Sequence, residues 1–311
     1  MPAKQQKTLA DPVQSARLLR LATVSSVTTA TLLIAAKLGA FIMTGSVSIL
    51  ASLIDSLLDA GASLVNLFAV NYSLSPPDEE HRFGHGKAES VAGLAQATLI
   101  CGSGVYLIVE SIRRLVDPPQ LQDLGIGLAV MVFSMLATVV LLAIQHHVIQ
   151  RTQSVAIRAD SLHYKTDLFT NAAIILALAL TQWGWSGMDP IFALGVAVYI
   201  IYSAWQIGYE AFNDLLDKEL PDERRQEILD LINEHPEVEG AHDLRTRLSG
   251  RTVYMQVHIE LEDHMTLLQS HRISDEVEAA LLKQFPTADI VIHQDPVGIV
   301  EERIDDAVST T

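Results

Sequence analysis

The chain has 311 residues, of which 49% are hydrophobic, and a single cysteine, Cys101. One cysteine excludes a disulfide framework within the chain and a CxxC metal site. The charges are unevenly distributed: 22 acids and 9 bases lie from Asp217 onward, against 15 and 12 before it. An apolar, nearly neutral front part is therefore joined to an acidic back part. The sequence has no basic stripe that could neutralise phosphates, which argues against nucleic acid as a partner.

Six apolar runs are each long enough to cross a membrane as a helix, which takes about 20 residues. Six such runs separated by short polar loops would leave a soluble domain without a polar surface. The sequence therefore predicts a membrane α-helical protein with six transmembrane helices in a lipid bilayer. The runs lie near Leu18–Met43, Ser48–Tyr72, Ser90–Ile112, Leu124–His146, Val155–Trp183 and Pro190–Phe212.

Lysine and arginine in the loops predict the orientation, because they accumulate on the cytoplasmic side. The N-terminal segment and the loops after the second and fourth runs carry such residues, among them Arg17, Arg82 and Arg151. The loops after the first and fifth runs carry none. The loop after the third run has acids only, although Arg113 and Arg114 stand just before it. We therefore expect both termini to lie in the cytoplasm.

The residues after Phe212 are patterned like a soluble domain. One segment is typical of an amphipathic helix, and another alternates apolar and polar side chains as a half-buried strand does. Ser249-Gly250 predicts a hairpin turn between two of the strands. The order helix, strand, strand, helix, strand predicts a small α+β domain with its helices on one face of a short sheet. These elements are expected at Asp222–Asn233, His242–Leu248, Arg251–Leu261, Ser274–Phe285 and Asp289–His293.

The patterns together divide the chain into four parts. An N-terminal cytoplasmic arm is expected at residues 1–16, followed by the six-helix transmembrane domain at 17–213. The cytoplasmic α+β domain is expected at 214–296, and an acidic, disordered tail at 297–311.

Ionisable side chains inside a bilayer cost at least ~2.5 kcal/mol each near its centre, so they point to function. The second run carries Asp55 and Asp59, and the fifth carries His163 and Asp167. Each pair is spaced i, i+4 and therefore shares a helix face. If the two faces meet, three carboxylates and one imidazole converge inside the membrane. The alternative is that such residues are helix caps or loop residues, an interpretation we apply to Asp160 near the cytoplasmic end of the fifth run.

Three carboxylates and an imidazole suit a borderline divalent cation, which binds four N and O ligands at roughly 2.0–2.2 Å. Zinc and cadmium fit this set, and iron(II) and cobalt(II) stay open because affinity order alone does not select the metal. Magnesium fits less well because it prefers six hard oxygens. Lys37 also lies in an apolar run, where we expect it to snorkel or to pair structurally rather than to bind metal.

Two further groups of ligating residue types lie outside the membrane. Asp78, His81 and His85 share one cytoplasmic loop, where they form either a half-exposed metal site or a set of solvated loop residues. In the soluble part, His293 and Asp295 are two residues apart and therefore share a strand face. A polar face rich in histidine is consistent with a metal site and equally with a plain surface.

Five strings in the chain form a set that is specific to one family. They are Gly45-Ser-Val-Ser-Ile-Leu-Ala51 ahead of Asp55 and Asp59, Phe83-Gly-His-Gly-Lys-Ala-Glu89, Arg158-Ala-Asp-Ser-Leu-His-Tyr-Lys-Thr-Asp167, His242-Asp-Leu-Arg-Thr-Arg247 and His293-Gln-Asp-Pro296. In these strings the chain resembles the cation diffusion facilitator family, and within it the bacterial zinc-transporting group. The resemblance covers nearly the whole chain, except the arm before about Val13 and the tail after about Val300.

The resemblance implies a homodimer in the cell inner membrane and a metallochaperone-like cytoplasmic domain. It implies that Asp55, Asp59, His163 and Asp167 form the transport site, and that Lys87 and Asp217 form a salt bridge that locks the dimer. Because Glu79 and Glu80 adjoin Asp78, the ligating carboxylate of the loop stays open. The resemblance also implies a loop metal site at Asp78, His81 and His85 and a binuclear cytoplasmic site, with structural zinc, at His242, His258, His271, His293 and Asp295.

The resulting hypothesis is zinc efflux in exchange for protons by alternating access, with cadmium and iron(II) as further candidate substrates. Ligation requires deprotonated groups, and His163 is the natural proton carrier because histidine titrates near neutrality. A passive divalent-cation channel is the alternative, and it would show flux without proton coupling. An intramembrane metalloenzyme would need an open coordination position and a general base. No His-Glu-x-x-His motif occurs in the sequence, and we do not expect an enzyme.

Overall fold

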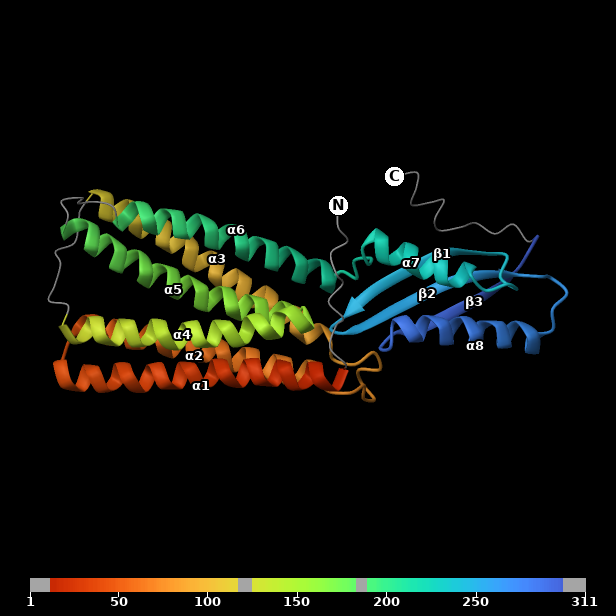
Figure 1. Cartoon of the computed structure of the whole chain (residues 1–311), viewed down its shortest axis with the longest axis horizontal. Helices are drawn as coiled ribbons and strands as arrows, with labels where there is room; N and C mark the ends of the chain where they lie inside the picture. Colours follow the sequence, from red (N-terminus) through yellow and green to blue (C-terminus); the bar gives the residue numbers. More distant parts are fainter. Residues whose placement is uncertain (1–11, 117–124, 183–188, 299–311) are drawn as a thin grey trace. The chain divides into compact units, whose positions relative to one another are not determined.

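A computed structural model describes residues 12–116, 125–182 and 189–298 (Figure 1). The chain divides into two compact units, Met1–Phe212 and Asn213–Thr311. We refer to them as the membrane unit and the cytoplasmic unit. The predicted N-terminal arm and acidic tail fall mostly outside the described ranges.

Within the described ranges the membrane unit is built from long helices, one for each of the six apolar runs. Five of them are long and apolar enough to cross a membrane. The exception is α5, whose first half carries Arg158, Asp160, Lys165 and Asp167 among its apolar residues. The prediction of a membrane α-helical fold is therefore confirmed. The helices are α1 Pro12–Thr44, α2 Val47–Ser73, α3 Lys87–Val116, α4 Gly125–Thr152, α5 Val155–Gln182 and α6 Asp189–Leu215.

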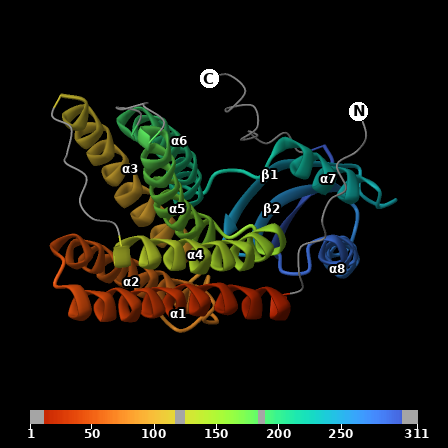
Figure 2. The same ribbon diagram turned by 60° about the vertical axis from the view of Figure 1, so that its left-hand side comes forward.

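The helices pack most closely at the end where α2 leads into α3 and α4 into α5. Apolar side chains from all of the first five helices meet there, among them Leu19, Val70, Ala92, Val148 and Ile157. Each of these is 5% exposed or less. Figures 1 and 2 show α3, α5 and α6 diverging from α1, α2 and α4 toward the other end. The two groups of helices are therefore in contact at the packed end and farther apart at the other end, which we call the open end.

Two glycines of α3 allow neighbouring helices to approach it closely. A Cβ on Gly93 would lie 2.8 Å from Cγ1 of Val155, and one on Gly104 would lie 2.6 Å from Cγ1 of Ile201. Small residues at such crossings let helix backbones pack together in a membrane, where dispersion replaces the hydrophobic effect as the driving force. These contacts hold α3 against α5 and α6.

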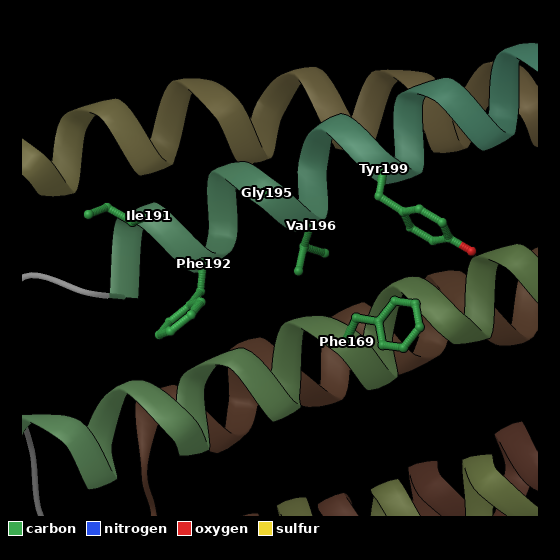
Figure 3. A pocket seen from close by; sticks show the side chains of 6 residues that line it. All are labelled: Phe169, Ile191, Phe192, Gly195, Val196 and Tyr199. Atoms are coloured by element: carbon green, nitrogen blue, oxygen red, sulfur yellow. The ribbon is translucent and has the colours of Figure 1, made fainter.

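A groove of about 520 Å³ lies between α5 and α6 toward the open end (Figure 3). The rings of Phe169 and Tyr199 meet across it edge to face, with 5.7 Å between their centroids. Its lining is almost entirely apolar, so it does not suit a metal ion. The residues that line it are Phe169, Ile191, Phe192, Gly195, Val196 and Tyr199.

Asp160 is fully buried in the membrane unit rather than being a cap or loop residue, and our interpretation of it is corrected. Its carboxylate accepts hydrogen bonds from Ser26 Oγ at 2.6 Å, from Gln145 Nε2 at 2.8 Å and from Gln96 Nε2 at 3.3 Å. These partners come from α1, α4 and α3. A buried carboxylate needs such partners to offset its lost hydration, so Asp160 joins four helices at the packed end.

The cytoplasmic unit is a three-stranded sheet with two helices on one face. Strand β2 is central, pairing antiparallel with β1 and parallel with β3. Ile228 and Ile232 of the first helix and Ile273 and Leu281 of the second are fully buried against the apolar face of the sheet. The predicted α+β domain is confirmed. Its elements are α7 Asp222–Asn233, β1 Gly240–Ser249, β2 Thr252–Leu261, α8 Leu267–Gln284 and β3 Asp289–Pro296.

Two predicted boundaries of this unit were wrong. The second helix begins at Leu267 rather than Ser274, because Thr266 caps it: Thr266 Oγ1 accepts from the Gln269 backbone N–H, and the Gln269 side chain accepts from the Thr266 N–H. This reciprocal capping box stabilises a helix start. The last strand continues past His293 to Pro296 because it pairs in parallel with β2 along its whole length.

We expect Ile259→Ala to destabilise the cytoplasmic unit by about 2–5 kcal/mol, because it empties a fully buried core position. The measurement is hydrogen exchange of β2 and β3 amides in the full-length chain, which reports local opening free energy. Leu268→Ala, at a position that is 79% exposed, is the control and should change that free energy by less than about 0.5 kcal/mol. Equal effects of the two substitutions would contradict this core.

Candidate metal centres

Three predicted ligands of the membrane unit lie together between α2 and α5. They are Asp59 of α2 and His163 and Asp167 of α5, and one ligand atom from each lies within 4.8 Å of the others. Nε2 of His163 is 2.9 Å from Oδ1 of Asp59. His163 and Asp167 are one turn apart and so share the face of α5 that meets α2. All three are half-buried, and together they can hold a cation with one nitrogen and two or more oxygens.

Asp55 is the predicted ligand that the structure does not bring into this group. It lies one turn before Asp59 on α2 and is exposed. Three protein ligands leave one position of a tetrahedral ion open. The role of Asp55 as the fourth ligand stays a prediction.

Tyr164 anchors α5 beside the membrane cluster. Its hydroxyl is 2.9 Å from Ser63 Oγ of α2 and donates to the backbone oxygen of Ser26 of α1 at 3.3 Å. Tyr164 adjoins His163 and is 2% exposed. Hydrogen bonds beside a candidate ligand fix the orientation of the helix that carries it, so Tyr164 and Ser63 hold the His163 face of α5 toward Asp59.

The loop between α2 and α3 brings Asp78, His81 and His85 together. Oδ1 of Asp78 is 3.2 Å from Nδ1 of His81, and its Oδ2 is 3.2 Å from Nε2 of His85. The loop turns at Gly84, whose φ of 76° suits glycine. Among the three consecutive acids of this loop, Asp78 is the one that groups with the histidines in the structure.

Asp78 is also held by the loop backbone. The backbone N–H groups of His81 and Glu80 donate to its Oδ1 at 2.6 and 3.0 Å. The His81 N–H bond, which favours the ionised carboxylate, lowers the pKa of Asp78 below its ordinary value. The carboxylate therefore stays charged and able to bind a cation at lower pH than a free aspartate would.

In the cytoplasmic unit, three histidines form a row across the sheet. His242 pairs with His258 across β1 and β2, and His258 pairs with His293 across β2 and β3. Asp295 contacts all three: its Oδ2 is 2.8 Å from His258 and 3.3 Å from His242, and its Oδ1 is 3.1 Å from His293. The pairing of the strands thus builds a polar N and O ligand set on the sheet face opposite the core.

A β-bulge places His242 in this row. The register of β1 and β2 shifts between His242 and Arg245, where Asp243 has a φ of 50°. A bulge bends a strand and re-aims its side chains. His242 Nδ1 then lies 3.1 Å from Glu260, and its Nε2 faces Asp295. A carboxylate that binds one ring nitrogen orients the imidazole, so that the other nitrogen is available to a metal ion.

Three other predicted site residues are not brought into these groups. His271 lies on α8, where its Nε2 is 3.7 Å from Asp275. Asp217 pairs with Arg247 at 3.3 Å within the cytoplasmic unit, whereas Lys87 belongs to the membrane unit. The predicted dimer salt bridge between Lys87 and Asp217 stays a prediction.

Several residues that shape the membrane site were missed in the sequence. Tyr164, Ser63, Gln96 and Gln145 contribute buried polar groups that reach other helices. The feature of the sequence that could have identified them is their polarity inside apolar runs. For Tyr164 there is also its spacing of four residues from Asp160. That signal does not say which helix each side chain meets, because the spacing defines only a face.

Comparisons with known proteins agree with this arrangement. Residues 23–216 match the cation efflux transmembrane domain, and residues 220–297 match the cytoplasmic domain of cation efflux proteins. The cation-efflux pump FieF of Escherichia fergusonii is 50% identical over 284 residues, which cover 91% of this chain and 95% of that protein. FieF of Escherichia coli O1:K1 is 51% identical over the same shares. A solved structure of the putative zinc transporter CzrB in its zinc form is 30% identical and covers 28% of this chain and 99% of that one, with a TM-score of 0.26.

A bundle of membrane helices with ionisable ligands facing one another is the architecture of a membrane protein that moves cations. The chain belongs to the cation diffusion facilitator family, the cation efflux proteins. It is a multi-pass transporter and not an enzyme, as predicted.

We expect Asp295→Ala to weaken zinc binding by the cytoplasmic cluster about 10- to 100-fold, because Asp295 contacts all three histidines of the row. Isothermal titration of the full chain in an Asp59→Ala, Asp78→Ala background isolates this cluster from the membrane ligands and from the loop group. His264→Ala, whose side chain is 87% exposed, is the control and should leave binding unchanged. Unaltered zinc affinity in the Asp295 variant would show that the row is only a polar surface.

Proposed function

We propose that this chain exports zinc across the cell inner membrane in exchange for protons, working as a homodimer by alternating access. The observation that carries the proposal is the group formed by Asp59, His163 and Asp167 between two membrane helices. Groups of this kind are costly inside a bilayer and mark ion pathways. Their meeting across α2 and α5 leaves a place for one cation.

The chemistry of the group favours zinc. One imidazole nitrogen and carboxylate oxygens match the ligands of a tetrahedral zinc ion, whereas magnesium prefers six oxygens and keeps its water. Cadmium and iron(II) would be accepted by the same ligands, so we propose them as further substrates. The relatives named cation-efflux pumps support the export of a cation.

Proton exchange follows from the way the ligands are used. A metal ion binds deprotonated groups, so binding releases protons and protonation assists release. His163 faces Asp59 at hydrogen-bond distance, so a proton on the ring can take over the contact with the carboxylate when the metal leaves. We propose His163 as the proton-coupling residue. The closed packing at one end of the bundle and the divergence at the other support a cycle in which the site opens to one side at a time.

The sites outside the membrane would support this cycle rather than carry the ion across. The histidine row with Asp295, and the loop group at Asp78, supply N and O ligands that fit structural zinc. We propose that zinc there favours one arrangement of the dimer, since an ion shifts an equilibrium toward the state that binds it better. His271 and the Lys87–Asp217 pair belong to the same proposal. Both termini would lie in the cytoplasm.

Replacing His163 or Asp59 with Ala should abolish zinc uptake into proteoliposomes, because each substitution removes a ligand from a group of three. The measurement is the rate of zinc entry reported by an enclosed fluorescent indicator. His147→Ala, at an exposed position, is the control and should transport like the unaltered protein. Zinc flux that survives both ligand substitutions would refute the transport site.

An imposed pH gradient should drive zinc accumulation against its concentration gradient if export is coupled to protons. The measurement compares zinc uptake into proteoliposomes with and without the gradient, at equal zinc on both sides. A passive divalent-cation channel would equilibrate zinc but not accumulate it. Indifference to the gradient would favour the channel over the antiporter.

A further inference from the structure

Lys37 of α1 is half-buried in the membrane unit, two turns before the helix ends at Thr44. Its Nζ donates to the backbone oxygen of Ser52 at 3.1 Å and to Ser56 Oγ at 2.6 Å, both in α2. Helix α1 ends at Thr44 and α2 begins at Val47, so Lys37 and these two serines lie at a similar depth of the hairpin. A snorkelling lysine would extend toward the membrane surface. Lys37 instead reaches sideways to the neighbouring helix, and of our two sequence interpretations the structural pairing is correct.

The place where Lys37 is bound lies beside the membrane metal group. Ser52, Ser56 and Asp59 follow one another at helical spacing and so share a face of α2. The ammonium interacts electrostatically with the carboxylates of Asp55, Asp59 and Asp167. Among the described residues, however, no carboxylate comes within ion-pair distance of it. The two serines thus hold the ammonium of Lys37 close to the carboxylates. They also keep it out of the position that a metal ion would occupy between them.

We propose that Lys37 is a fixed countercharge of the transport site, which weakens metal binding and thereby allows release. The inference rests on the proposed function, because it assigns a role to Lys37 in that same site. The three carboxylates that interact with Lys37 are the ligands Asp59 and Asp167 and the neighbouring Asp55. With a divalent ion bound, these three carboxylates leave one negative charge in the region of the site, and Lys37 balances it. The loaded site is then neutral, which lowers the cost of moving it through a medium of low dielectric constant.

Two opposite effects follow if the charge of Lys37 is removed. The repulsion between the ammonium and the metal disappears, so zinc should bind about tenfold more tightly, as expected for one like charge removed at close range in a partly buried site. The loaded site then carries a net charge and holds its ion more firmly, so turnover should fall by about the same factor. A residue that only braced α1 against α2 would weaken binding instead.

The experiment compares Lys37→Gln and Lys37→Leu with Lys37→Arg in the full-length protein. Zinc dissociation constants come from isothermal titration in detergent, and KM and kcat from stopped-flow flux into proteoliposomes. Both uncharged variants should show a lower dissociation constant, a lower KM and a lower kcat, and Lys37→Arg should stay close to the unaltered protein. Leucine is apolar like the residues around position 37, so the leucine variant should fold and can still be measured if the glutamine variant does not fold.

Ser56→Ala provides a second, independent test, in which the zinc affinity should change in the opposite direction. It leaves the charge of Lys37 in place but removes one of its two anchors, so the ammonium can approach the carboxylates and compete with zinc. Zinc binding should then become weaker, opposite to the effect of removing the charge.

Unchanged or weaker zinc binding in both uncharged variants would overturn the inference, as would an arginine variant that behaves like them. If the unaltered protein bound and transported no zinc, the proposed function would fail and the role of Lys37 with it. Transport by the unaltered protein without tighter binding in the variants would refute the role of Lys37 alone.

Discussion

The membrane unit depends on one constraint: ionisable side chains held in a bilayer must find partners on other helices. Asp59 and His163 meet this constraint across α2 and α5 at 2.9 Å. Without such a contact each group would have to be neutral or to reach water, because an isolated charge is strongly disfavoured in a medium of low dielectric constant. The same constraint suits the pair to cation binding, because a bound cation can replace the contact that Asp59 and His163 make with each other.

The helix that carries most of the polar groups is also the least suited to the membrane by composition. α5 presents its polar residues on two adjoining faces. His163 and Asp167 face α2, while Asp160 and Tyr164 are anchored by partners on α1, α2, α3 and α4. The anchors stabilise the helix in a setting where its charges would otherwise be exposed to lipid. They also limit how α5 can rotate, so that movement of His163 and Asp167 is tied to movement of the packed end of the bundle.

In the cytoplasmic unit, the register of three strands brings three histidines and Asp295 together on one face of the sheet. One alternation along β2 puts Met255, Val257 and Ile259 into the core and His258 on the opposite face. Strand pairing then brings His242 and His293 beside it, and Asp295 reaches all three. Because the row depends on register, a slip of one residue would turn the ligands of one strand to the other face. The apolar core thus sets the geometry of the polar face.

The sequence by itself determined the membrane class, the helical runs and the small α+β domain, because hydropathy and periodicity are local properties that one chain displays directly. It also singled out the four ionisable residues Asp55, Asp59, His163 and Asp167 inside apolar runs. It also carried the family resemblance, which the comparisons confirmed. Only the tertiary structure decided that Asp59, His163 and Asp167 meet while Asp55 stands apart, that Asp160 is a buried junction of four helices, and that Lys37 is bound to α2. The physical reason is that spacing along one helix defines a face but not its partner. Which faces meet follows from the packing of all the helices together, and the partners of a buried charge exist only once that packing has formed.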